Sequence, residues 1–215
     1  MAQRLRILGI VMVASGIFGF GVAGFTAINT LDGMNALQKF SQAQAVNLSY
    51  KDGVLVDHGS ADGAQKIIDL VTKDWGYKLN MADLNPNDPL VNTASEYMYQ
   101  MGAISEHTLS GKTTVVLPAD VTKQDGTVVK AGTYEFQNDG RYYSGFNYAD
   151  PIESAARGQL WSGTALSLIG QLGVGAVTAN TLMIGLGLVG VIGGLAGTLL
   201  LLGPGLVWAS RAKLA

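Results

Sequence analysis

The chain has 215 residues, of which 48% are hydrophobic and only 14% are charged, and it contains 29 glycines. All 16 acidic residues and 10 of the 14 basic residues lie between Asp32 and Arg157, which gives this segment a net charge of −6. The remaining charges are the basic residues Arg4, Arg6, Arg211 and Lys213. Soluble proteins carry about 25% charged residues, so this composition is typical of a membrane protein. The acidic middle excludes a nucleic-acid binder, and the lack of cysteine excludes a disulfide scaffold or a Cys-ligated metal site.

The first apolar segment is long enough to cross a bilayer. No residue between Ile7 and Asn29 is charged. A helix of this length spans about 35 Å, against about 30 Å of hydrocarbon. A cleaved signal peptide is the alternative, but apolar regions of signal peptides are about 7–15 residues long. We therefore predict a retained transmembrane helix over residues 7–29.

The second apolar segment is too long for one crossing, because Gly158–Ser210 contains no charged residue. We expect breaks at Gly173-Val174-Gly175 and at Gly203-Pro204-Gly205. The segment between them predicts a transmembrane helix over 178–203. Residues 153–177 are predicted to form an amphipathic helix that lies in the interface or packs on protein. Two closely spaced crossings are the alternative, but they would place Arg211 on the other side from Arg4, against the positive-inside rule.

The predicted fold is therefore an α+β membrane protein, with two transmembrane helices flanking a small extracytoplasmic domain of helices and a short antiparallel sheet. Its parts are a cytoplasmic N-terminus (1–6), the first transmembrane helix (7–29), the extracytoplasmic domain (30–152), the amphipathic helix (153–177), the second transmembrane helix (178–203) and a cytoplasmic C-terminus (204–215).

Glycines in both apolar helices have the spacing that lets helices approach closely in lipid. We expect helix packing at Gly16, Gly19, Gly190, Gly193, Gly194 and Gly197, with the general abundance of glycine in membrane helices as the alternative.

The central segment changes from helical to strand-like periodicity along the chain. Ser60 predicts a helix that ends at Gly76, and Asp88-Pro89 predicts the start of a second helix that ends at Gly111. The pair Asp150-Pro151 has the same helix-start chemistry. Short β-prone runs follow at 113–117, 127–130, 133–136 and 141–144, with tight-turn signals at Asp125-Gly126 and Asp139-Gly140.

The sequence contains few of the motifs that are typical of catalytic or metal-binding sites. The only histidines, His58 and His107, lie in no metal-ligand motif, so a metal site would have to be assembled from distant parts of the chain. The acidic residues Asp57, Asp62 and Glu106 are near them in sequence. The chain contains no G-x-S-x-G motif and no complete phosphate-binding loop. We therefore predict no catalytic residue, no metal ligand and no cofactor.

Aromatic residues gather in the strand-like part of the chain. Tyrosine is enriched in protein interfaces, so these residues are a candidate interaction surface, with cross-strand packing as the alternative. They are Tyr134, Tyr142, Tyr143, Phe146 and Tyr148.

The layout resembles a group of small actinobacterial membrane proteins, some labelled aromatic ring-opening dioxygenase. The segments that carry the resemblance are DLNPNDPLVNTASEYMYQMGAI, GTYEFQNDGRY and GQLWSGTALSLIGQLGVGAVTANTLMIGLG. Similar proteins occur as accessory subunits of respiratory assemblies such as the cytochrome bcc–aa3 supercomplex. The resemblance implies an actinobacterial plasma-membrane protein with a role in electron transport.

Three functions remain open. The first is a non-catalytic accessory or scaffold subunit whose partners are integral membrane subunits of a larger complex, with the respiratory supercomplex as first candidate. The second is an extracytoplasmic ligand-binding or envelope-sensing protein, and the third is a metal-dependent enzyme. We expect the first, because the crossings contain no ionisable group and the glycines favour helix association.

Overall fold

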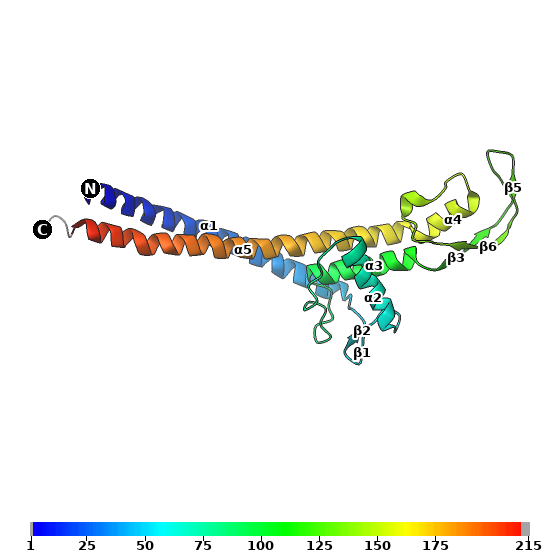
Figure 1. The fold of residues 1–215 in the computed structure, drawn as a ribbon, viewed down its shortest axis with the longest axis horizontal. Helices are drawn as coiled ribbons and strands as arrows, with labels where there is room; N and C mark the ends of the chain where they lie inside the picture. The colour runs from blue at the N-terminus through cyan, green and yellow to red at the C-terminus, as the bar shows by residue number, and fades with distance from the viewer. Residues whose placement is uncertain (1, 212–215) are drawn as a thin grey trace. The chain divides into compact units, whose positions relative to one another are not determined.

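Two long apolar helices, α1 (Ala2–Gln44) and α5 (Gly163–Arg211), enclose a small α+β domain in sequence (Figure 1). The computed structural model describes residues 2–211. Both helices are long and apolar enough to span a membrane. The chain divides into two compact units, a helix pair from the described parts of 1–43 and 178–215, and a central domain, Gln44–Val177. The α+β class with two long apolar helices is confirmed, whereas Lys213 lies outside the described residues.

The helix pair is antiparallel and packs on small residues. A Cβ atom built on Gly9 would lie 2.5 Å from the carbonyl oxygen of Gly203, and one on Gly185 would lie 2.7 Å from Oγ1 of Thr30. Four buried residues of α1 follow one another at seven-residue spacing: Gly9, Gly16, Ala23 and Thr30. A seven-residue repeat is the period at which two helices stay in contact by coiling around each other with a left-handed twist.

The predicted packing glycines divide into two groups. A Cβ on Gly16 would lie 2.7 Å from Leu200, and one on Gly19 would lie 2.9 Å from Ala196. Gly193 and Gly197 make ordinary contacts with Ala23 and Phe20 in the same seam. By contrast, Gly190 and Gly194 lie outside it, because neither has a described neighbour within 4 Å of its Cβ position.

The predicted breaks in the second apolar segment do not occur, since α5 is one continuous helix that includes Pro204. Packing at both predicted breaks explains the difference. A Cβ on Gly175 would meet the ring of Tyr97 at 2.7 Å, and one on Gly203 would meet the Gly9 carbonyl oxygen at 2.8 Å. Close packing at these positions therefore requires glycine, whose cost inside a helix is only about 1 kcal/mol relative to alanine. The predicted amphipathic helix over 153–177 is therefore two pieces, α4 (Pro151–Leu160) and the start of α5.

The N-terminal helix is also longer than the transmembrane segment predicted at 7–29. It continues to Gln44 through a run of good helix formers that includes Met34, Ala36 and Leu37. Its added turns include Gly33, whose Cβ position lies 2.6 Å from Leu182. The charged residues Asp32 and Lys39 are exposed on this extension.

The first helix of the central domain begins as predicted, and the second does not. Ser60 caps α2 (Ala61–Asp69), which continues as a π-helical turn, η1 (Leu70–Asp74). The helix predicted at Asp88-Pro89 begins later, as α3 (Ala94–Leu109). The backbone of residues 89–91 instead pairs with residues 46–48, through Leu48 N to Pro89 O and Val91 N to Val46 O. Thr93 and Glu96 form a capping box that sets the true start of α3.

The strands form three separate antiparallel pairs rather than one sheet. The longest pair is β3 (Lys112–Leu117) with β6 (Gly132–Gln137), in which Val115 opposes Tyr134. The others are β4 (Val121–Thr122) with β5 (Val128–Val129), and β1 (Tyr50–Lys51) with β2 (Val54–Leu55). Residues 141–144 were predicted as a strand but lead into a 3-10 turn, η2 (Tyr143–Gly145). The turn at Asp139-Gly140 directs the chain there, because Gly140 N donates to Leu109 O at the end of α3.

The core of the strand-rich half lies between the β3–β6 pair, α4 and the ends of η1 and α3. Its buried members are Leu70, Leu109, Val115, Leu117, Phe136, Phe146, Ala156 and Trp161. Ile169 of α5 packs against this cluster. The start of α5 is thus packed on protein, one of the two arrangements expected for residues 153–177.

We predict that cysteines at positions 23 and 193 form a disulfide. The Cβ atoms would lie about 4.0 Å apart, within the range found in disulfides. The chain has no natural cysteine, so an oxidised Ala23→Cys/Gly193→Cys variant has no competing pair. A mobility shift on non-reducing gels, reversed by reductant, measures the bond.

The matched control is Ala23→Cys/Gly190→Cys, because Gly190 lies off the seam. Adding Gly203→Leu to the first pair should reduce its cross-linking, since the new side chain would meet backbone atoms, whereas Gly205→Leu should not. Equal cross-linking at positions 190 and 193 would contradict the seam.

Candidate functional site

The predicted aromatic surface is only partly exposed. The side chains of Tyr142, Tyr143 and Tyr148 are 45%, 44% and 54% exposed. Phe146 is 4% exposed and stacks on Phe136 at a centroid distance of 5.8 Å, so it belongs to the core rather than to a surface. The hydroxyl of Tyr134 donates to the Lys130 carbonyl. Three of the five residues therefore remain available on the surface.

Tyr142, which precedes η2, contacts two tryptophans. The indole Nε1 of Trp75 donates to the Tyr142 hydroxyl at 2.8 Å. The Tyr142 ring stacks on Trp161 with centroids 5.9 Å apart, and Trp161 Nε1 donates to the Arg141 carbonyl. These contacts hold residues 141–142 against α4 instead of in a strand.

Arg157 gives the exposed part of this surface a cationic centre. Its guanidinium carbon lies 4.6 Å from the ring centroid of Tyr143 and 4.0 Å from that of Tyr148. Its Nε is buried and has no hydrogen-bond partner among the described residues. Cation–π contacts of this kind are strongest when the cation is shielded from water, so they fix both tyrosines in place.

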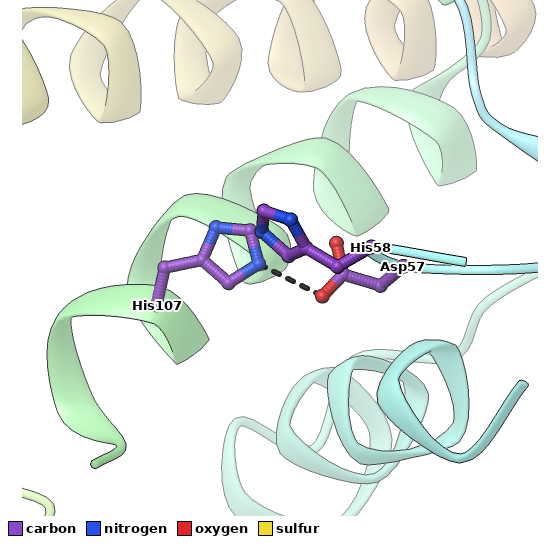
Figure 2. Close-up of side chains that lie close together, drawn as sticks. All are labelled: Asp57, His58 and His107. Carbon is purple, nitrogen blue, oxygen red and sulfur yellow. Dashed lines mark hydrogen bonds and ion pairs between the residues drawn. The ribbon is translucent and has the colours of Figure 1, made fainter. Parts of the chain in front are cut away.

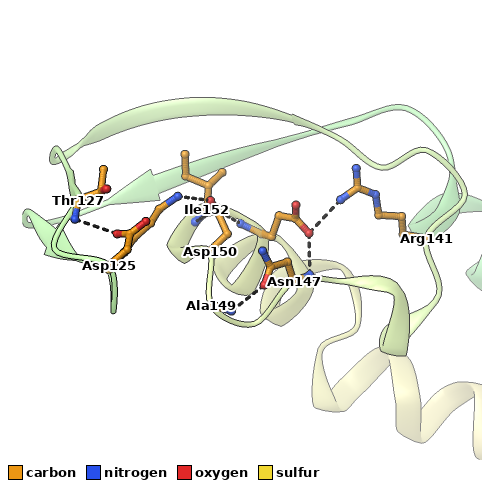
Figure 3. Close-up of polar contacts among 9 residues, drawn as sticks. Asp125, Thr127, Arg141, Asn147, Ala149, Asp150 and Ile152 are labelled. Atoms are coloured by element: carbon orange, nitrogen blue, oxygen red, sulfur yellow. Dashed lines mark hydrogen bonds and ion pairs between the residues drawn. The ribbon is translucent and has the colours of Figure 1, made fainter.

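A polar network joins the β4–β5 hairpin to the start of α4 (Figure 3). One carboxylate oxygen of Asp150 accepts from the backbone N–H groups of Ile152 and Glu153, which caps the helix. The other accepts from Lys123 Nζ at 2.7 Å. Glu153 in turn bonds Arg141 at 3.0 Å and accepts from the backbone N–H of Asn147.

The electrostatics of this network favour its charged form. The hydrogen bond from Lys123 is the largest cause that lowers the pKa of Asp150 below 3.8. The same bond raises the pKa of Lys123. Both side chains are about three-quarters shielded from solvent. The network therefore links the β4–β5 hairpin to the first turn of α4 through a charged pair.

The two histidines meet in space, although no motif joins them in sequence (Figure 2). His107 Nε2, near the end of α3, lies 2.8 Å from Oδ2 of Asp57. The ring centroid of His58 lies 4.5 Å from that of His107. One ligand atom from each of Asp57, His58 and His107 lies within 4.8 Å of the other two. Two imidazoles and a carboxylate are a donor set that divalent transition metals use.

A tight turn positions the first two of these side chains. His58 and Gly59 have φ angles of +47° and +78°. The backbone N–H groups of Asp57 and Ser60 each donate to the other's carbonyl, which closes the turn. Ser60 then caps α2, so the turn is fixed at both ends. Histidine tolerates a positive φ better than most residues, which fits its place here.

Two hollows adjoin the His–Asp cluster. An open one of about 470 Å³ is lined by the cluster together with Lys66, Glu106 and Ser110. A smaller one of about 140 Å³ is lined by Asp57, His107 and Tyr99 among others. Tyr99 is 3% exposed, and its buried hydroxyl has no hydrogen-bond partner among the described residues. Burial, with a smaller effect of the Asp57 charge, raises the pKa of Tyr99, so the phenol stays protonated.

Comparison with protein families, with curated proteins and with solved structures finds no match. Sequence reasoning placed His58 and His107 in no site, because 49 positions separate them. The one signal was Asp57-His58-Gly59-Ser60, whose glycine and helix-capping serine predict a tight turn that presents the histidine.

We predict that Asp150→Ala lowers the free energy of unfolding of the central domain by about 1 kcal/mol or more, because it removes a helix cap and an ion pair. Asp150→Asn should cost less, since its amide oxygen can still cap α4. Denaturant unfolding in a Trp208→Phe background, followed by the fluorescence of Trp75 and Trp161, measures both.

The stability difference between wild type and Asp150→Asn should depend on pH. The lowered pKa of folded Asp150 means that the ion pair contributes fully above the unfolded value near 3.8 and is lost as pH falls through the folded value. The difference should therefore be constant from pH 5 to 7 and shrink below about pH 4. A difference that grows on acidification would contradict this assignment.

Proposed function

We propose that this protein is an accessory subunit anchored in the plasma membrane by the α1–α5 helix pair. The observation that supports this most strongly is the apolar surface that both helices expose. Phe18 is 75% exposed, Phe25 71% and Leu201 80%. Exposed apolar residues of this size along two whole helices are unfavourable in water and match the hydrocarbon of a bilayer.

Three polar side chains inside these helices have local hydrogen-bond partners, as suits a bilayer. The side chains of Thr26, Asn29 and Thr198 each donate to the carbonyl four residues earlier in the same helix. Between Ile7 and Leu31, and between Gly163 and Ser210, neither helix contains a charged residue. Helices of this kind provide no path for ions or protons, which favours an anchor over a transporter.

The distribution of charge supports an orientation with both termini in the cytoplasm. Arg4 and Arg6 lie at the start of α1 and Arg211 at the end of α5, and antiparallel packing brings these ends together. Trp208 is 73% exposed near Arg211, a position typical of the membrane interface. The acidic central domain then lies outside the cytoplasm, in agreement with the positive-inside rule.

The outer face of α5 supports a partner within the membrane. Gly190 and Gly194 are four residues apart and have no described neighbour within 4 Å of their Cβ positions. They lie off the seam with α1, so their spacing leaves room for a helix of another subunit. The respiratory supercomplex, the first candidate from sequence resemblance, is the assembly to test first. A ligand-binding function is the second candidate, favoured by the unpartnered hydroxyl of Tyr99.

Single cysteines test the orientation. Gln3 and Gln124 are both exposed and lie on opposite sides of the membrane in this proposal. A membrane-impermeant maleimide should label Gln124→Cys on intact cells and label Gln3→Cys only after permeabilisation. Labelling of Gln3→Cys alone on intact cells would overturn the orientation.

Copurification tests the accessory role. The tagged protein, extracted in mild detergent, should bring down larger membrane subunits in a fixed ratio, with haem absorbance if the partner is respiratory. Gly190→Leu should reduce this recovery severalfold and leave the 23–193 disulfide intact, because it affects only the outer face. Gly205→Leu, also without close neighbours, is the control. Recovery of the chain alone at full yield would contradict the proposal and favour ligand binding.

A further inference from the structure

We propose that Asp57, His58 and His107 bind one divalent transition-metal ion of the Zn²⁺ class on the central domain. The three ligand atoms lie within 4.8 Å of one another, and Figure 2 shows the side chains converging from a turn and from α3. This inference is independent of the accessory role, because it concerns a site outside the helix pair.

The geometry is close to that of a zinc site. Zn²⁺ binds imidazole nitrogen and carboxylate oxygen at about 2.0–2.2 Å in a tetrahedron, which places neighbouring ligand atoms about 3.3 Å apart. Oδ2 of Asp57 and Nε2 of His107 are 2.8 Å apart. The third ligand atom, from His58, lies within 4.8 Å of both, and the imidazoles of His58 and His107 are exposed, so their side chains have room to rotate toward a shared ion. The ion would replace the proton that the Asp57–His107 hydrogen bond now shares.

The turn keeps the ligands close before any ion binds. The reciprocal backbone hydrogen bonds between Asp57 and Ser60 hold Asp57 and His58 on a short, closed loop. Asp57 is the most shielded ligand, with 19% of its side chain exposed, against 41% for His107. A shielded carboxylate attracts a cation more strongly than an exposed one, because solvent screens it less.

A second observation points to a ligand at the same place. The hydroxyl of Tyr99 is buried without a hydrogen-bond partner among the described residues, and Tyr99 lines the hollow that Asp57 and His107 also line. Buried polar groups without partners are uncommon in folded proteins. Three protein ligands leave a fourth zinc position for water, and this hollow of about 140 Å³ has room for one.

The charges around the site leave it attractive to a cation. Glu106 and Lys66 line the neighbouring hollow and have opposite charges, and Lys66 is exposed. With Asp57 included, the formal charges of these three side chains sum to −1. Bound metal would join the turn before α2 to the last turns of α3, across 50 positions of sequence. Such a link should stabilise the central domain.

The test uses the full chain in mild detergent, stripped of metal by a chelator and purified with a tag that contains no histidine. Calorimetric titration with Zn²⁺ should show one ion per chain, with a dissociation constant of about 1 μM or below. Saturating Zn²⁺ should raise the unfolding temperature of the central domain by about 5–10 °C. The chain has two histidines and no cysteine, so Co²⁺ absorption bands report on this site alone.

His58→Asn and His107→Gln should each weaken Zn²⁺ binding by more than about 100-fold, since loss of even an outer partner of a ligand costs 10–100-fold. Asparagine accepts the positive φ at position 58. Asp62→Asn, an exposed carboxylate in the first turn of α2, is the control and should bind as wild type. Unfolding temperatures without metal show whether each variant is folded.

Two results would overturn the site. One is the absence of Zn²⁺ binding to folded wild-type protein at 100 μM. The other is unchanged stoichiometric binding in a folded variant that carries both histidine substitutions.

Discussion

The close approach of two helix backbones at Gly9 and Gly203 is the constraint on which the helix pair depends. Carbonyl oxygens lie 2.5–2.8 Å from the positions where side chains would begin, so no larger residue fits without separating the helices. This contact lies beside Pro204, through which α5 continues without a break, and small residues recur along the seam at Gly16, Ala23 and Thr30. Large apolar side chains are thereby directed outward, which is what makes the pair suited to lipid.

Local sequence patterns, such as hydropathy and helix-capping residues, predicted much of the fold. Low charge and high hydropathy identified both long helices, and Ser60 and Asp150 cap helices as expected. The same helix-start chemistry failed at Asp88-Pro89, because the following backbone pairs with residues 46–48 and because Thr93 and Glu96 form a stronger cap. The predicted breaks in α5 failed for a related reason, since packing from Tyr97 and from α1 outweighed the flexibility of glycine.

The composition of the candidate sites could not be predicted from the sequence. Asp57 and His107 are 50 positions apart, and only the packing of α2 on α3 brings them together. The sequence grouped the aromatic residues by their spacing, but the burial of Phe146 and the exposure of Tyr148 depend on the path that the Asp139-Gly140 turn imposes. Contacts between segments that are distant in sequence decide which side chains meet and which are buried, and the local periodicity of the sequence does not predict such contacts.

In the proposed bilayer setting, the small-residue seam would give the two units different thermodynamic behaviour. Lipid chains are as apolar as the helices, so separating α1 from α5 in a bilayer exposes little apolar surface to water. The heat-capacity increase on unfolding arises from such exposure. In calorimetry it would therefore come almost wholly from Gln44–Val177, at about 1.6–2.0 kcal/mol/K. The stability of the central domain would curve with temperature, whereas the association of the two helices, held by van der Waals contact, would change almost linearly.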